Sequence, residues 1–180
     1  MDFDTHTISG TMPASVLTLG LTAYGLVFIA PAQANPETDA EPEALLDADA
    51  TWRYLDDGTD PSNGLPSRTD WAAPEFDDSD WSEAAGSFGA LRDQLTELSG
   101  GYLPDNLLNQ YYEGTTDNIE AFFFRSDFTV NTDEIDDDAV ITGAVRYDDA
   151  AIIYVDGERV DGFHDDGLPF TEEGEDRNIV

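Results

Sequence analysis

The sequence predicts an all-β protein, an antiparallel β-sandwich with one short helix, and three patterns in the chain support this prediction. The first is an alternation of apolar and polar residues between Phe122 and Val130, in the segment FFFRSDFTV. One face of this segment would carry Phe122, Phe124, Phe128 and Val130, and the other Arg125, Asp127 and Thr129. A period of two residues is typical of a half-buried strand.

The second pattern is a β-hairpin signal near the end of the chain. An apolar run is broken there by Asp156-Gly157, and this dipeptide is the strongest short-range signal for a two-residue type I′ turn. Such a turn would place Ile153 opposite Val160 and Tyr154 opposite Arg159. The two strands would then pair in an antiparallel sheet.

The third pattern is the recurrence of short apolar segments between turn signals. A strand is expected from Thr51 to Leu55, and another from Ala139 to Tyr147, AVITGAVRY. Residues rich in Asp, Gly, Pro and Asn follow the first of them, from Asp56 to Gly64, and an acidic turn is expected from Asn131 to Asp138. Several short strands separated in this way indicate an all-β sandwich.

Two other segments are expected to differ from strands. The segment from Trp71 to Trp81 contains too many helix- and strand-breaking residues for a long element, and its aromatic residues are five positions apart. We expect it to form an irregular loop pinned to the edge of the sandwich. The predicted helix runs from Phe88 to Leu98, where three leucines recur at i, i+4 and i+7, and Gly100-Gly101 would end it.

The amino terminus is predicted to be a signal peptide. An apolar stretch runs from Val16 to Ala30, and Ala32 and Ala34 form the small-residue pattern that precedes cleavage, here before Asn35. The stretch is shorter than the roughly 20 residues that a membrane-spanning helix needs. The residues before it include no Lys or Arg, so either the true start lies elsewhere or the signal is atypical. A single membrane anchor is the competing interpretation.

The domain organisation follows from these segments. Residues 1–34 are the expected signal peptide, and residues 35–50 are an acidic, proline-containing segment that is expected to be a flexible leader. Residues 51–167 would form the β-sandwich module, and residues 168–180 an irregular tail. The chain has no cysteine, so the core of an exported module would have to form without disulfides.

The composition is strongly acidic. The 180 residues include 40 Asp and Glu against 7 basic residues, all of them Arg, and the formal charge is −33. A charge of this size and sign excludes nucleic acid as a partner and increases self-repulsion in the folded chain. The favoured explanation is a solvated acidic surface suited to a salty environment, where salt screens the repulsion. Calcium binding by carboxylate clusters is the alternative.

Four segments together resemble a known family. In chain order they are WRYLDDG from Trp52, WAAPEFDDSDW from Trp71, FFFRSDFTV from Phe122 and YDDAAIIYVDGERV from Tyr147. In this order they resemble the galactose-binding-like β-sandwich, a jelly-roll module appended to many secreted bacterial hydrolases. The stretch from Gly86 to Tyr112 is similar to the amino-terminal module of secreted actinobacterial metallophosphoesterases. The resemblance covers roughly residues 51–167.

The resemblance implies a secreted or cell-surface accessory module of a metallophosphoesterase-type protein whose catalytic domain is absent from this chain. A dinuclear phosphoesterase centre needs several His, Asp and Asn ligands. The chain has two histidines, and His6 lies in the expected signal peptide, which leaves His164. We therefore predict no enzyme activity and no catalytic, cofactor-binding or metal-binding residues. The family's closing strands have no counterpart in Gly167 to Val180, so a truncated module is expected.

Four further places could carry other chemistry. His164-Asp165-Asp166 could form a small metal site or an acid–base pair, although a solvated loop is favoured. Asp77 to Asp80 and Asp133 to Asp138 offer oxygen ligands for a structural calcium ion, without the spacing of an EF-hand. Tyr102, Tyr111 and Tyr112 are the candidate sugar-stacking residues. The alternative functions are therefore a carbohydrate-binding module that recognises an extracellular glycan, and an inactive truncated fragment.

Overall fold

The computed structural model describes residues 4–8, 15–22, 45–97, 102–129, 141–145, 147 and 150–163. The strands of these residues are β1 (Asp4–Ile8), β2 (Ser15–Thr22), β3 (Thr51–Leu55), β4 (Ser82–Ala85), β5 (Phe88–Gly89), β6 (Asn106–Leu107), β7 (Phe122–Phe128), β8 (Ile141–Val145), β9 (Ala150–Val155) and β10 (Glu158–Phe163). A short 3₁₀ helix, η1, spans Asp70–Ala72. Within the described ranges, no helix is long and apolar enough to cross a membrane. The all-β prediction is confirmed.

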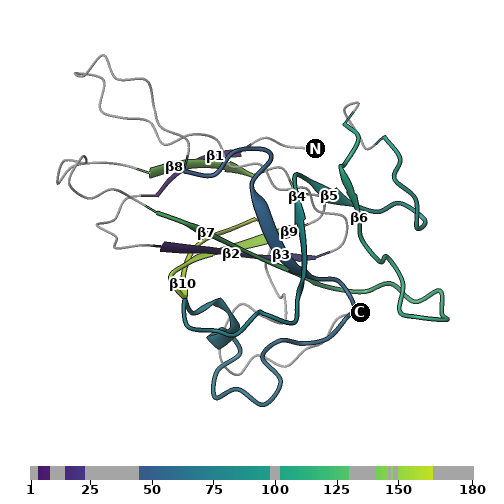
Figure 1. The fold of residues 1–180 in the computed structure, drawn as a ribbon, viewed down its shortest axis with the longest axis horizontal. Coiled ribbons are helices and arrows are strands. Elements are labelled where there is room, and N and C mark those ends of the chain that lie inside the picture. The colour runs from purple at the N-terminus through teal and green to yellow at the C-terminus, as the bar shows by residue number, and fades with distance from the viewer. Residues whose placement is uncertain are drawn as a thin grey trace.

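A six-stranded antiparallel sheet, in the order β10-β9-β2-β7-β3-β4, organises the fold (Figure 1). β1 and β8 form a separate antiparallel pair, and the short strands β5 and β6 pair in parallel. β3 begins and ends at the predicted residues, and β8 lies within the predicted strand from Ala139 to Tyr147. The predicted turn from Asn131 to Asp138 and the predicted irregular tail, residues 168–180, lie outside the described residues.

Successive residues of β7 enter two different hydrophobic clusters, because neighbouring side chains of a strand point to opposite faces of the sheet. The main core lies on the face of Phe122 and Phe124 and also contains Trp52, Phe88 and Val145. The second cluster lies on the opposite face and contains Trp71, Ala72, Phe123, Ile152 and Tyr154. The prediction that β7 is half-buried is therefore wrong: Phe122 to Ser126 are all buried, since both faces of the sheet are covered here.

The predicted hairpin is present, with one correction to its register. Asp156 and Gly157 have φ values of 51° and 81°, the positive values that a type I′ turn requires at both central residues. Arg159 lies opposite Tyr154 as predicted. A register shift between Arg159 and Asp161 then places Asp161, and not Val160, opposite Ile153. Such an irregularity inserts an extra residue into one strand, and the turn signal carries no information about it.

The predicted helix from Phe88 to Leu98 is wrong for its described part, which ends at residue 97. Phe88 and Gly89 pair with β6, and the chain then makes a tight turn in which Leu91 and Gln94 exchange backbone hydrogen bonds of 3.2 Å. Arg92 and Asp93 have φ values of 56° and 54°, which no right-handed helix contains. The leucine spacing does not produce a buried helical face, since Leu91 and Leu95 are exposed.

The segment from Trp71 to Trp81 is an irregular loop beyond η1, as predicted, but it covers a face of the sheet and not its edge. The indole of Trp71 is fully buried, with its ring centroid 4.8 Å from Phe123 and 5.6 Å from Tyr154. Phe76 and Trp81 make an edge-to-face contact at 5.8 Å and pack against the same cluster. We call residues 70–81 the covering loop.

Residues from the two amino-terminal segments take part in the described fold. Leu46, within the segment expected to be a flexible leader, is buried in the main core. β2, which overlaps the apolar stretch of the expected signal peptide, lies between β7 and β9.

Candidate functional site

A groove of about 450 Å³ lies beside β3 and β7. The segment before and at the start of β3 contributes to its lining through Leu45, Leu46, Asp47, Ala50 and Thr51. Its charged lining consists of four acidic residues and two arginines, Asp47, Arg53, Asp78, Glu83, Arg125 and Asp127. Because the acids outnumber the bases, the groove disfavours an anionic ligand such as a phosphate ester.

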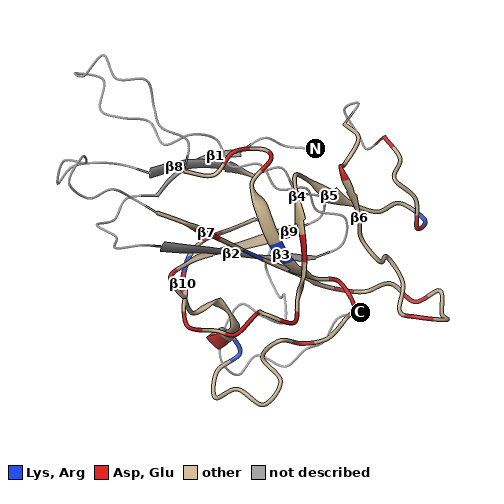
Figure 2. Cartoon of the chain, in the orientation of Figure 1, with Lys and Arg blue, Asp and Glu red and all other residues tan. Residues whose placement is uncertain are grey.

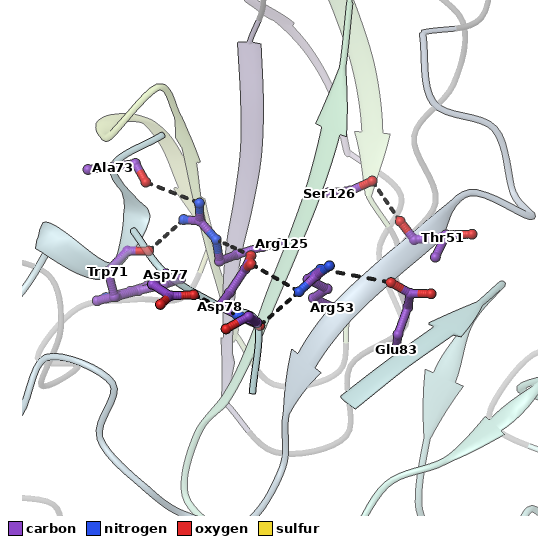
Figure 3. A network of polar contacts seen from close by, with 10 residues as sticks. Thr51, Arg53, Trp71, Ala73, Asp77, Asp78, Glu83, Arg125 and Ser126 are labelled. Atoms are coloured by element: carbon purple, nitrogen blue, oxygen red, sulfur yellow. Dashed lines mark hydrogen bonds and ion pairs between the residues drawn. The ribbon is translucent and has the colours of Figure 1, made fainter. Parts of the chain in front are cut away.

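Arg125 is the central residue of this site and is buried, with 3% of its surface exposed. β7 places it on the face of the second cluster, below the covering loop. Its Nε donates to Asp78 Oδ2 at 2.8 Å, Nη1 donates to the carbonyl of Trp71 at 2.6 Å, and Nη2 donates to the carbonyl of Ala73 at 3.1 Å (Figure 3). The guanidinium carbon also lies 5.4 Å from the centre of the Phe76 ring. All three guanidinium nitrogens are thus engaged within the chain.

Arg53, on β3, contacts the same carboxylate from the other side (Figure 3). Its Nη1 lies 3.4 Å from Asp78 Oδ1 and also donates to the backbone carbonyl of Asp78 at 3.2 Å. Its Nε lies 3.8 Å from Glu83 Oε2 on the neighbouring strand β4. The Arg53 side chain is 39% exposed, and ion pairs at such exposed positions contribute little to stability. Asp78 is therefore held between a buried and an exposed arginine.

The sequence pattern does not reveal this arrangement. The alternation around Phe124 places Arg125 on the polar face of a half-buried strand, and the acidic run suggests Asp78 as a calcium ligand. One feature of the sequence could have indicated the site: Arg125 stands next to a run of three phenylalanines, which suggests that it is buried. A buried arginine requires a carboxylate or carbonyl partner. The identity of that partner depends on the path of the covering loop.

Two of the candidate calcium ligands from Asp77 to Asp80, Asp77 and Asp78, make other contacts in the structure. Asp77 Oδ1 accepts a hydrogen bond of 3.1 Å from the backbone N–H of Ser79. The hydrogen bonds from Ser79 lower the pKa of this exposed carboxyl. Among the residues that the structure describes, no group of three or more His, Cys, Asp or Glu side chains could hold a metal ion. Asp133 to Asp138 and His164-Asp165-Asp166 lie outside the described residues.

The pKa of the Asp56 carboxyl group is raised above its ordinary value. Burial is the main cause, and the nearby charge of Asp57 adds to it, while a hydrogen bond of 2.8 Å from the backbone N–H of Asn109 opposes it. The hydrogen bond connects the end of β3 with the segment after β6. This carboxylate therefore acts in the fold as an acceptor between two segments.

The three candidate sugar-binding tyrosines differ in accessibility. The hydroxyl of Tyr102 donates to Ser87 Oγ at 2.9 Å, and Tyr111 forms an isolated β-bridge with Asn118. Tyr112 is 38% exposed, and its ring lies so close to Gly58 that a methyl group there would overlap it. Tyr112 is thus the candidate that offers an exposed aromatic surface, beside Gly58.

Comparisons with known proteins place no family at this site. No protein-family model matches the chain, no curated protein matches it, and no solved structure matches it.

Proposed function

We propose that this chain is a non-catalytic accessory module of the galactose-binding-like, jelly-roll type, belonging to a metallophosphoesterase-type protein. The sequence segments that resemble this module supply the strands β3 and β7, the covering loop and the β9–β10 hairpin. The antiparallel sheet is compatible with a sandwich, and the separate β1–β8 pair would contribute to the second layer.

The observation that carries this proposal is that the Arg125 guanidinium forms its hydrogen bonds within the chain. A buried arginine with free donors would be a binding group for an anionic substrate, whereas each guanidinium nitrogen here is bound to Asp78 or to a loop carbonyl. The groove beside it is lined by more acids than bases. The best-developed polar cluster of the described chain therefore holds the covering loop on the sheet.

The proposal is tested by assaying the purified full chain with an aryl phosphate, with and without added Mn²⁺, Fe³⁺ or Zn²⁺. We expect no turnover above the rate of the metal alone, because the sequence supplies two histidines, His6 and His164, where a dinuclear centre needs several metal ligands. Metal-dependent turnover that disappears in His164→Ala would overturn the proposal. Arg159→Gln, which alters a residue at the edge hairpin, is the control for a nonspecific effect of substitution.

We also propose that the protein is secreted or displayed on the cell surface, directed there by residues 1–34. The apolar stretch from Val16 to Ala30 and the small-residue pattern at Ala32 and Ala34 support this location. Expression in a Gram-positive host followed by intact-mass analysis of the culture medium tests it. Protein found in the cytoplasm alone would contradict the proposal.

Glycan binding is the second candidate function, and the exposed ring of Tyr112 favours it. Aromatic rings bind sugars by stacking against their apolar faces, and the ring of Tyr112 is exposed beside Gly58. Glycan-array binding by the full chain, compared with Tyr112→Ala, tests this function. Binding that persists unchanged in Tyr112→Ala would exclude Tyr112 as the contact.

A further inference from the structure

The strand β2 (Ser15–Thr22) occupies an inner position of the six-stranded sheet (Figure 1). Along one edge it pairs antiparallel with β7, from Ser15 opposite Phe128 to Leu21 opposite Phe122. Along the other edge it pairs antiparallel with β9, from Leu17 opposite Val155 to Thr22 opposite Ala150. Since β7 and β9 are not neighbours in the sheet, β2 is the strand that joins β10–β9 to β7–β3–β4.

The residue pattern of β2 matches the two faces that its neighbours create. Directly paired residues lie on the same face of a sheet. Leu17, Leu19 and Leu21 therefore share rows with residues of the main core, including Phe122, Phe124, Ala151 and Val155. Thr18, Gly20 and Thr22 share the opposite face with Phe123, Ile152 and Tyr154, the residues on which Trp71 packs.

This division of large and small residues has a physical reason. The indole of Trp71, from the covering loop, packs on the second face, and Thr18, Gly20 and Thr22 fall on that face by register. The three leucines occupy positions on the face of the main core. A shift of one residue would exchange the two sets, so the pattern specifies the register. An export signal requires an apolar segment and no such alternation.

The neighbouring strands also require a partner at this position. The side chains of β7 from Phe122 to Ser126 are buried, as are most of those of β9. Without β2, the facing N–H and C=O groups of both strands would lose their hydrogen bonds inside the fold, and buried backbone groups without partners are strongly disfavoured.

We propose that the space between β7 and β9 is a strand-binding site, and that its occupant is Ser15–Thr22 of the same chain. The ligand class is an extended apolar peptide that pairs antiparallel on both edges and alternates leucine with small residues. The segment would then serve as a structural strand as well as part of an export signal, and it would stay in the site by strand pairing after a cut before Asn35. The proposal does not depend on the accessory function, because it follows from pairing and register alone.

The experiment uses the full chain with a specific protease site replacing residues 41–44, which precede the buried Leu46. The folded protein is cut at this site and analysed by gel filtration and mass spectrometry. We expect the amino-terminal fragment to remain bound in a one-to-one complex and the thermal midpoint to become dependent on protein concentration, as for any bimolecular fold. A fluorescent peptide of residues 13–24 should exchange into the cut protein.

Three variants test whether binding uses the proposed register. Leu19→Asn replaces a leucine in the row of Phe124 and Ile153, and Gly20→Leu adds bulk in the row of Phe123 and Ile152. Each should weaken peptide binding at least about tenfold. The matched control is Val16→Asn, because position 16 pairs with the exposed Asp127 and lies beyond the end of the pairing with β9.

The outcomes separate two interpretations. Retention of the fragment, or its loss together with unfolding of the remainder, supports the proposal, since in both cases the fold depends on β2. A fragment that separates while the remainder keeps its circular dichroism spectrum and thermal midpoint overturns it. Equal binding of the Leu19→Asn and Val16→Asn peptides would also overturn it, because the register would then have no role.

Discussion

The two faces of the six-stranded sheet are stabilised in different ways, although the same strands supply residues to both. On the main-core face the contacts are apolar and largely aromatic: Phe88 lies 5.0 Å from both Tyr54 and Phe124, measured between ring centroids. On the opposite face Trp71 packs in a similar way on Phe123, but the buried cation Arg125 lies beside it.

The difference reflects what covers each face. The main core is closed partly by strand residues, such as Phe88 of β5 and Val145 of β8, whose backbone groups have strand partners. The covering loop has no such pairing, and the carbonyls of Trp71 and Ala73 instead accept hydrogen bonds from Arg125. A loop can close a hydrophobic cluster when a buried side chain supplies the missing donors.

The largest expected effect comes from removing that donor. Arg125→Met keeps an apolar stem but leaves the carbonyl of Trp71 without its Arg125 donor and Asp78 with Arg53 alone. The carbonyl of Ala73 keeps only the hydrogen bond from the N–H of Phe76. We expect the free energy of unfolding to fall by about 3–5 kcal/mol, the usual range when one partner of a buried ion pair is removed. Urea unfolding followed by tryptophan fluorescence measures it.

Arg53→Met is the matched control for this prediction. It removes an arginine from the same carboxylate, but from a partly exposed position, and should cost no more than about 1 kcal/mol. If both variants lost a similar amount of unfolding free energy, the buried Arg125 would not be more important for stability than the exposed Arg53. The proposed difference between the two faces of the sheet would then be wrong. Limited proteolysis should also cut the covering loop of Arg125→Met first.

The next effect concerns the hairpin turn, which touches the covering loop. A Cβ atom at Gly157 would lie 3.3 Å from the Cα of Ala73, and the φ of Gly157 is +81°. Gly157→Val should therefore lower the free energy of unfolding by roughly 1–3 kcal/mol, the range of a strained backbone position. Thermal and urea unfolding measure the loss.

Two further variants separate strain from crowding at this turn. Gly64 has a similar φ of +87°, and a methyl group added there would meet no atom within 4 Å, so Gly64→Ala reports the backbone strain alone. Gly157→Ala should cost more than Gly64→Ala if the contact with Ala73 matters. The exposed control Glu158→Gln should stay within about 0.5 kcal/mol of the original protein. A harmless Gly157→Val would contradict the contact between hairpin and loop.

Salt should stabilise the protein as a whole. With 40 acidic and 7 basic residues, repulsion opposes the compact state, and the described acids are spread mostly over loops and strand ends (Figure 2). Raising NaCl from about 0.1 M to about 1 M shortens the screening length from roughly 10 Å to roughly 3 Å. We expect the thermal midpoint to rise by about 4 °C or more. A constant midpoint would show that repulsion does not limit stability.

The smallest effect is a pH dependence at Asp105, away from both faces. Its Oδ2 accepts hydrogen bonds from the hydroxyl of Ser87 at 2.6 Å and from the Ser87 N–H at 3.0 Å, and these bonds lower the pKa of the carboxyl. A lowered pKa in the folded state means that the stabilisation is complete above the ordinary value and is lost as pH falls through the folded value.

Asp105→Asn should accordingly be less stable than the original protein at pH 6, and the difference should narrow as pH falls below about 4. Unfolding free energies measured across this range test the sign. Asp117→Asn, an exposed acid in a neighbouring loop, is the control. A difference that widens toward low pH would contradict the assigned hydrogen bonds.

The sequence by itself determined the elements whose signals are local. The strand from Thr51 to Leu55 and the positive φ values of Asp156 and Gly157 agree with the sequence prediction. These features depend on apolar alternation and on backbone sterics within a few residues, so their causes lie in the segment itself.

Only the tertiary structure decided the features that depend on distant partners. The leucine spacing after Phe88 gave no helix, because Phe88 and Gly89 pair with β6. The hairpin register changed after Arg159, where the second strand contains an irregularity. Arg125 became a buried anchor because the covering loop brings Asp78 to it across 47 residues of sequence. The apolar segment that begins at Val16 gained a position between β7 and β9 in the same way, because pairing edges exist only once both strands are in place.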